Sequence, residues 1–547
     1  MPAVKVIRQD LEGLVGLQLT LEEVGGAIES LAGEVEGSSG DEITLKFEPI
    51  RPDMFSVEGI ARAMRGMLEV EVGLKRYEVK GAKHALVVDG SVGPVRPVIF
   101  GAFVRDVRFD DYMIRSIMDL QEKIHATLGR DRKKVSIGVH DASRIKPPFT
   151  YKAVDPESVT FVPLGMEREL DLNEILSKHE KGIEFSWILK GQKAYPLLVD
   201  AEDNVLSFPP IINGELTRVS GSATDLFIDV TGLDEGACST ALTILCCAFA
   251  DRGARIEAVE VSAGGKKRAT PDMQPRKGVV EMSYVRRLLD PGLGPKECVR
   301  ALERLRHGAV FDKKKERIEV QIAPYRSDIL HPADLVEDVA MGIGYDRFAP
   351  VLPKAGTMAS KARSTATSRA AVGSLIGLGF AEIVTLVLTD RATGAKARAE
   401  DDMVPLLNPF TVEHTHLRGS LLPSVLQVVS LNRRRDMPIK VFELGLCVHP
   451  SKGKPREGYN LCGITMHPKA GFTECKSVVE TLLRDLGSSP DVRERAHASF
   501  IPGRCASILI CEKDIGYFGE VHPDVLVAFE LPAPAVAFEI DMQALSK

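Results

Sequence analysis

The sequence predicts an α+β multidomain protein, and three observations lead to that prediction. The chain has 547 residues, which is too many for one hydrophobic core and suggests about three to five domains. Helical stretches with apolar stripes alternate with short strand-like runs along the whole chain. The composition is that of an ordinary globular protein, with 44% hydrophobic and 27% charged residues.

The first domain is expected over residues 1–88 as a small α+β module. It begins with a strand-like run, VKVI, which a helix-like segment and a Gly/Ser turn follow. A second helix follows Pro52, and its apolar residues recur at helical spacing, which predicts a packed face. These residues are Phe55, Ile60, Met64 and Met67.

The second domain, residues 89–268, is expected to be the largest and to contain a mixed or antiparallel sheet. A long amphipathic helix is predicted over residues 112–128, with its apolar positions at helical spacing. Short strand-like runs follow this helix. A helix near residues 239–252 is apolar on almost every side, which predicts that it is buried.

Two further domains complete the prediction. Residues 269–351 contain two helices, a hairpin across Asp312 to Lys315 and an acidic helix, and this order suggests a winged-helix-like module. Such a shape does not by itself imply binding to nucleic acid. Residues 352–547 are expected to form a final α/β domain.

Composition excludes some classes of function. The formal net charge is −6, so no global positive field points to nucleic acid. Nine cysteines without a CxxC pair indicate reduced core residues. The absence of a signal-peptide-like start or of about 18 consecutive apolar residues predicts a cytoplasmic protein with no membrane partner. Four basic clusters are either solvated runs or phosphate contacts: Arg130–Lys134, Lys266–Arg268, Lys313–Lys315 and Arg433–Arg435.

The segment from Tyr325 to Phe348 carries the densest chemistry. If a helix begins near Pro332, three carboxylates lie on one face at i, i+3 and i+4, and a fourth lies six residues upstream. They are Asp334, Glu337, Asp338 and Asp328. No Lys or Arg lies one turn away within the helix, which suggests a hard cation such as Mg²⁺ or a basic group of a partner. Acidic residues that complement the helix dipole and face water are the alternative.

Several motifs of this chain resemble motifs of one protein family, and they occur along the chain in the same order as in that family. The acidic segment resembles the metal-bearing module of phenylalanyl-tRNA synthetase beta subunits. RPDMFSVEGIARAMRGML resembles their N-terminal module, PPIINGE and DVTG resemble their editing module, and VFELG resembles their synthetase-like domain. The resemblance covers nearly the whole chain, and the length and missing extra modules match the archaeal and eukaryotic cytosolic type.

The resemblance implies a set of partners and cofactors. The family forms an α2β2 heterotetramer in which the alpha subunit charges tRNA(Phe) with the use of ATP. It also implies Mg²⁺ shared with the alpha subunit, with Asp328, Asp334, Glu337 and Asp338 at the ligand positions. Since Mg²⁺ keeps several waters, some of these carboxylates are expected to act through water or to reach the partner.

The resemblance also implies hydrolysis of mischarged Tyr-tRNA(Phe) in the second domain. The site that activates phenylalanine is a hydrophobic pocket, and such a pocket rejects an analogue that adds only a hydroxyl by about 100-fold. Tyrosine would therefore sometimes be attached to the tRNA. Similarity places Leu198 and Ser207 in the editing pocket, Asp229 and Thr231 at its polar end, and Asn213 and Glu215 beside it.

Two alternatives bear on this editing site. Asp229 and Thr231 could instead shape a turn before Gly232, and PPIIN could be a rigid loop. No Ser-His-Asp or Cys-His set is apparent in this region, so hydrolysis would depend on a positioned water, assisted by the terminal hydroxyl of the tRNA. His140 and His179 are expected to be structural.

The final domain resembles a class II synthetase fold that is catalytically silent. Arg418 and Glu443 stand near the positions of the class II strand pair, but AVAFEIDMQAL replaces a Gly-rich strand that would end in Glu-Arg. Without that Arg, the clamp for the nucleotide is missing. Two competing functions stay open: a structural scaffold of the same complex without editing, and a free-standing RNA-binding or regulatory protein.

Overall fold

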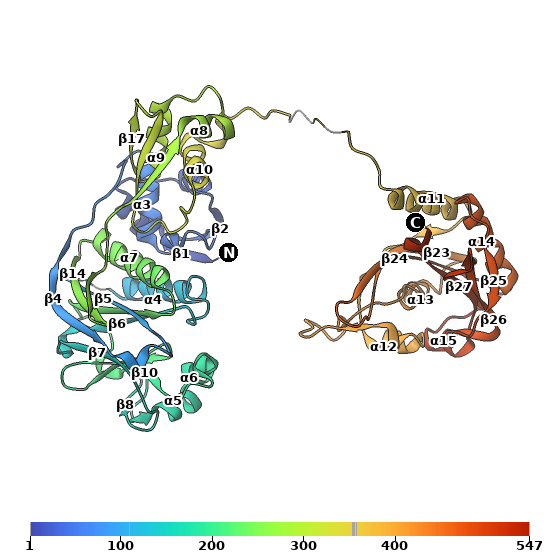
Figure 1. Ribbon diagram of the computed structural model, residues 1–547, viewed down its shortest axis with the longest axis horizontal. Coiled ribbons are helices and arrows are strands. Elements are labelled where there is room, and N and C mark those ends of the chain that lie inside the picture. Colours follow the sequence, from blue (N-terminus) through green and yellow to red (C-terminus); the bar gives the residue numbers. More distant parts are fainter. Residues whose placement is uncertain (1, 109, 353–355, 357, 546–547) are drawn as a thin grey trace. The chain divides into compact units, whose positions relative to one another are not determined.

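The computed structural model describes residues 2–108, 110–352, 356 and 358–545. The chain forms two compact units, Met1–Leu352 and Pro353–Lys547, and both are visible in Figure 1. The first unit contains three modules that share contacts, and the second contains one large sheet. Among the described residues, no helix combines the length and the apolar character that crossing a bilayer requires.

The N-terminal module is a three-stranded antiparallel sheet packed against three helices. The strands lie in the order β1-β3-β2, and α3 is buried over nearly its whole length, with the predicted apolar residues in the core. α2 begins with a capping box between Thr20 and Glu23. The elements are β1 (Ala3–Ile7), α1 (Arg8–Val15), α2 (Leu21–Ser30), β2 (Glu34–Ser39), β3 (Glu42–Lys46) and α3 (Val57–Met67).

The second module is built on a ten-stranded mixed sheet. Its path runs β12-β11-β10-β7-β4-β14-β5-β13-β6, and β15 pairs with β14. The strands are β4 (Val79–Val88), β5 (Val98–Arg105), β6 (Val135–Asp141), β7 (Phe149–Val154), β10 (Tyr195–Val199), β11 (Val205–Phe208), β12 (Ile212–Asn213), β13 (Leu226–Gly232), β14 (Arg255–Ala263) and β15 (Lys266–Thr270). Because β4 lies inside this sheet, the module begins before residue 79 and not at residue 89 as expected.

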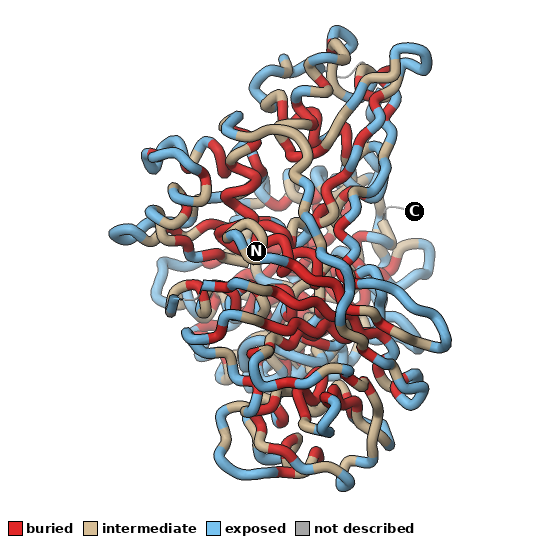
Figure 2. Tube along the Cα trace, turned by 90° about the vertical axis from the view of Figure 1, so that its left-hand side faces the viewer, coloured by how far each residue is buried: buried red, intermediate tan, exposed pale blue. Residues whose placement is uncertain are grey.

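Two helices cover one face of this sheet. α4 (Asp111–Ala126) packs on β6, and α7 (Glu235–Asp251) packs on β5 and β13. Both helices belong to one hydrophobic cluster, and Figure 1 shows them on the same side. The predicted amphipathic and buried helices are therefore confirmed within a few residues. An aromatic cluster of Phe103, Phe149, Tyr151 and Phe227 fills the other face, and the strands are buried along much of their length (Figure 2).

The third module contains the predicted elements in the predicted order: two helices, a hairpin and the acidic helix. Strands β16 (Arg276–Glu281), β17 (Gly308–Asp312) and β18 (Arg317–Ile322) lie in the order β16-β18-β17. α8 (Met282–Leu288), α9 (Pro295–Arg304) and α10 (Pro332–Ile343) complete it. α10 is the acidic helix, and it begins at Pro332 as predicted.

The second unit is organised by a seven-stranded sheet. Its order is β19-β23-β24-β28-β27-β26-β25, with antiparallel pairing except between β19 and β23. The strands are β19 (Ala381–Glu382), β23 (Ile439–His449), β24 (Arg456–Met466), β25 (Asp491–Glu494), β26 (Phe500–Ile510), β27 (Lys513–Val521) and β28 (Ala535–Asp541). Helices α11 (Arg363–Gly377), α13 (Leu422–Leu431) and α14 (Phe472–Asp485) pack against it.

Candidate active site

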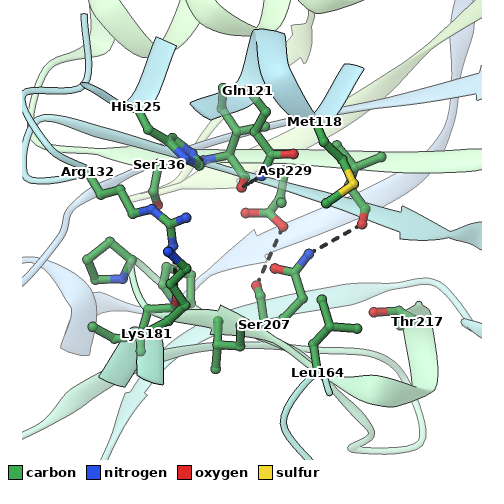
Figure 3. Close-up of a pocket in the computed structure, with 18 of the residues that line it drawn as sticks. Met118, Gln121, His125, Arg132, Ser136, Leu164, Lys181, Ser207, Thr217 and Asp229 are labelled. Carbon is green, nitrogen blue, oxygen red and sulfur yellow. Dashed lines mark hydrogen bonds between the residues drawn. The ribbon is translucent and has the colours of Figure 1, made fainter. Parts of the chain in front are cut away.

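A cavity lies beneath α4, and we call it the α4 cavity. Its volume is about 380 Å³, which is within the usual range of small-molecule sites. Apolar side chains of α4 and β6 form one wall, and the segment from Ser207 to Asn213 forms another. Arg132 and Lys181 lie toward one side, whereas Met118 and Leu164 lie toward the other (Figure 3).

The cavity exists because the sheet curls until its two ends approach each other. Asn213 in β12, at one end of the sheet path, donates a hydrogen bond of 3.3 Å to the carbonyl of Val139 in β6, at the other end. Arg132 donates a 3.0 Å bond to the carbonyl of Ile211 across the same seam. The seam therefore brings together polar groups that are far apart in sequence.

Asp229 is the central polar group of the cavity wall. It is only 2% exposed, and its Oδ1 lies 2.7 Å from Nε2 of His140 and 3.5 Å from the Ser207 hydroxyl. Within the described part of the chain, Oδ2 has no hydrogen-bond partner. A carboxylate with one anchored oxygen and one free oxygen can bind a hydroxyl, an ammonium group or a water in the cavity.

A second polar set of the cavity wall was not predicted. Arg132 is buried, contacts Glu122 at 2.7 Å and stacks on Phe185. This member of the Arg130–Lys134 cluster is therefore not a solvated surface residue. Burial alone would raise the pKa of Glu122, but its bond to His125 and the charge of Arg132 lower that pKa to about 2. Burial also lowers the pKa of His125, whose Nε2 accepts the amide proton of Ile137 at 2.8 Å.

The structure places three of the six predicted pocket residues on the cavity wall: Ser207, Asn213 and Asp229. Leu198 is fully buried in the aromatic cluster and does not line the cavity. Glu215 pairs with Arg218 at 2.7 Å and lies outside the lining. Thr231 is fully buried behind Ser136, to which it is bonded at 2.9 Å, so Ser136 presents the hydroxyl instead.

The alternative roles of these residues can now be compared. Asp229 and Thr231 lie inside strand β13, so the interpretation that they shape a turn is wrong. The PPIIN segment does form a tight connection, with a cis Pro209–Pro210 bond, and it also lines the cavity. His179 caps α6 (Glu180–Phe185), which is a structural role. His140, in contrast, links two cavity-lining residues, Thr217 and Asp229.

Asp338 and Asp328 of the acidic motif are committed to a buried ion-pair network. Asp338 is 2% exposed. It accepts bonds from Arg326 at 2.9 Å and His307 at 2.7 Å. The two oxygens of Asp328 also accept bonds from Arg326, at 2.8 and 2.6 Å. Two of the four expected ligand residues, Asp328 and Asp338, are therefore already paired with basic groups of this chain.

The remaining two carboxylates have different surroundings. One oxygen of Asp334 caps α10 by accepting the amide protons of Leu330 and His331, both at 2.7 Å, whereas Glu337 is exposed. The described residues contain no group of three or more His, Cys, Asp or Glu side chains that could hold a metal. Among the four expected ligands, Asp334 and Glu337 are the two that no basic side chain of the described residues pairs.

The polar residues expected in the second unit lie in a filled core. Arg418 and Glu443, the two residues predicted there, are buried and pair with each other at 2.8 Å. Glu539 of β28 accepts bonds from Ser420, Asn460 and Tyr517 at 2.6, 2.7 and 3.0 Å. The cavity beside Arg418 has a volume of only about 10 Å³, which is room for about one water molecule.

These folds and sites define a class of protein, a subunit of an aminoacyl-tRNA synthetase. The model of the tRNA synthetase B5 domain matches residues 279–345, and that of the phenylalanyl-tRNA synthetase beta chain CLM domain matches residues 349–542. The chain is 42% identical to the phenylalanine–tRNA ligase beta subunit of Archaeoglobus fulgidus, over 100% of this chain and 98% of that protein. It therefore belongs to the family of phenylalanine–tRNA ligase beta subunits.

Two further comparisons support this assignment. The beta subunit of Methanosarcina barkeri is 41% identical over 100% of this chain and 99% of that protein. The crystal structure of an N-terminal fragment of the Pyrococcus horikoshii beta subunit matches with a TM-score of 0.61 and 37% identity. That match covers 63% of this chain and 100% of the fragment. The archaeal type of the family, expected from the sequence, is confirmed.

Proposed function

We propose that this chain is the editing subunit of a phenylalanine–tRNA ligase and that the α4 cavity hydrolyses mischarged Tyr-tRNA(Phe). The observation that carries the proposal is a cavity of about 380 Å³ with apolar walls and the free oxygen of Asp229. A site that must bond a substrate hydroxyl rejects the analogue without it by about 10⁴-fold. Asp229 and Ser207 supply such acceptors and donors to a tyrosyl group.

The hydrolytic step requires only groups that the cavity and the substrate contain. A water oxygen bonds to the ester carbonyl carbon, the bond between that carbon and the ribose oxygen breaks, and the ribose oxygen takes up the proton that the attacking water loses. Asp229 can orient that water or bond the tyrosyl hydroxyl, since it lines the cavity and its Oδ2 has no hydrogen-bond partner among the described residues. The products are tyrosine and uncharged tRNA.

Charging with phenylalanine is assigned to the alpha subunit in an α2β2 assembly in the cytoplasm, with ATP as its substrate. The buried Arg418–Glu443 pair supports a silent second unit, because neither group is free to hold a phosphate. The isolated chain should therefore give no pyrophosphate exchange with ATP and phenylalanine. Mg²⁺ would be shared with the alpha subunit through Asp334 and Glu337, and no step here depends on it.

Deacylation of Tyr-tRNA(Phe) by the reconstituted complex tests the proposal. Asp229→Ala should lower the deacylation rate by roughly 5- to 150-fold, since each lost bond to a buried polar group costs about 1–3 kcal/mol. Phenylalanine charging should be nearly unchanged. Full retention of deacylation in this variant would show that the site lies elsewhere, and an inactive wild-type complex would favour the scaffold function.

A further inference from the structure

We infer that His140 is the positioning residue that holds Asp229 in its working orientation, an inference that rests on the proposed function. His140 lies in β6 and is fully buried. It does not line the cavity, so it cannot touch a substrate there. It does contact two residues that line the cavity from different segments, Asp229 in β13 and Thr217 in a short turn after β12.

The two ring nitrogens of His140 have different partners. Nε2 lies 2.7 Å from Oδ1 of Asp229, and Nδ1 lies 2.8 Å from the Thr217 hydroxyl. Because an ionised carboxylate only accepts hydrogen bonds, Nε2 must donate to Asp229. Nδ1 faces the hydroxyl of Thr217, whose own proton is directed at the carbonyl of Gly214. The arrangement joins a hydroxyl, an imidazole and a carboxylate, which the sequence did not reveal.

This arrangement differs from a nucleophilic triad in its accessibility. Thr217 is 1% exposed, and its hydroxyl also lies 3.2 Å from the carbonyl of Gly214. The imidazole is behind the wall, stacked on Phe227 with ring centroids 6.1 Å apart. Its contribution is therefore to fix Oδ1 of Asp229 and, with it, the orientation of the carboxylate at the cavity wall.

The absence of a side chain at Gly138 leaves room for this contact. A Cβ atom at Gly138 would lie 2.3 Å from Oδ1 of Asp229 and 2.8 Å from Nε2 of His140. Gly138 is paired with Asp229 across the strands and has no positive φ, so space rather than backbone freedom explains glycine there. The strand pairing, Gly138 and the imidazole of His140 together determine the position of the Asp229 carboxylate.

Two matched substitutions separate the two contacts of His140. The amide nitrogen of Gln can replace Nε2, so His140→Gln retains a donor to Asp229. The amide of Asn reaches only the place of Nδ1, so His140→Asn loses that donor. In the reconstituted complex, we expect kcat/KM for Tyr-tRNA(Phe) deacylation to fall about 10- to 100-fold in His140→Asn and less than about 5-fold in His140→Gln.

A double-mutant cycle distinguishes positioning from general structural support. In an Asp229→Asn background, His140→Asn should change kcat/KM by less than about 2-fold, because the group it positions is already altered. His84→Gln, at a half-buried histidine in β4 outside the cavity, serves as the control and should leave deacylation unchanged. Thermal unfolding of each complex checks folding.

Three results would overturn the inference while the proposed function stands: full activity of His140→Asn, equal losses in the Asn and Gln variants, or multiplied losses in the double mutant. An inactive wild-type complex would overturn the proposed function and this inference with it. Failure of the proposed function is therefore recognised by an inactive wild-type complex, and failure of this inference is recognised by the activities of the His140 variants.

Discussion

The α4 cavity and the Arg418 region of the second unit both contain buried carboxylates, but these carboxylates differ in how many of their oxygens have partners within the protein. In the first, Asp229 has one anchored oxygen and lines a cavity of about 380 Å³. In the second, Arg418 pairs with Glu443, Glu539 has several donors, and the adjacent space is about 10 Å³. A carboxylate oxygen without a partner beside a cavity indicates a ligand site, whereas charges that are paired within the protein indicate a structural core.

The largest effect that tests this comparison is expected at Arg418. Arg418→Ala leaves the buried carboxylate of Glu443 without its cation, and breaking such a pair costs about 3–5 kcal/mol. Urea unfolding combined with hydrogen exchange of peptides from β23 and β24 measures this loss. Arg433→Ala is the control, because the Arg433–Glu530 pair is largely exposed and should contribute no more than about 1 kcal/mol. Equal losses in the two variants would contradict the structural role of Arg418.

The acidic motif offers the same contrast within one helix. Asp338→Asn removes the charge between Arg326 and His307 and should destabilise the first unit by about 1.5–3 kcal/mol. Glu337→Gln, at the exposed neighbour, should leave stability unchanged but reduce the Mg²⁺ dependence of assembly with the alpha subunit. Denaturant titration and sedimentation at varied Mg²⁺ measure the two effects. Loss of stability in Glu337→Gln instead would reverse the assignment.

Gly138→Ala tests whether the cavity depends on the placement of Asp229. The added Cβ overlaps Oδ1 of Asp229, and overpacking of this kind costs about 1–3 kcal/mol. We expect deacylation of Tyr-tRNA(Phe) to fall roughly 5- to 150-fold. Gly81→Ala in β4, where nothing lies within 4 Å of the added atom, should have no effect. An active Gly138→Ala enzyme would mean that the carboxylate has more freedom than the structure shows.

The smallest effect concerns acid sensitivity at the cavity wall. Because burial lowers the pKa of His125 below its usual value, the folded state binds fewer protons than the unfolded state. This contribution to stability is complete above about pH 6.5 and is lost as the pH falls below it, by about 1 kcal/mol per pH unit. Thermal unfolding between pH 7.5 and about pH 5.5 should show a smaller slope in His125→Gln. An unchanged slope would assign the sensitivity to another group.

Local patterns in the sequence predicted the helices and strands better than they predicted which strands pair with each other. The apolar stripe gave α4 within two residues, and Pro332 marked the start of α10. Helix boundaries depend on neighbouring residues, which the sequence displays directly. β4 could not be assigned in this way, because its place depends on pairing with β14, which lies about 170 residues later in the chain.

The site was predicted in part for the same reason. Asp229 and Ser207 were found through a family resemblance, but the anchoring of Asp229 by His140 depends on strand pairing between β6 and β13. Arg326 was adjacent to the acidic motif in sequence, yet its contact with Asp338 requires the turn before α10. Arg132 looked like part of a solvated basic run until the curled sheet placed it across from Ile211.

Binding of a non-hydrolysable tyrosyl-adenosine amide to the complex tests the central claim most directly. Isothermal titration should show one site for each copy of this chain, and Asp229→Ala should abolish or greatly weaken it. The corresponding phenylalanyl compound should bind far more weakly, because it lacks the hydroxyl. Equal binding of both compounds, or full binding by Asp229→Ala, would contradict the assignment of the α4 cavity.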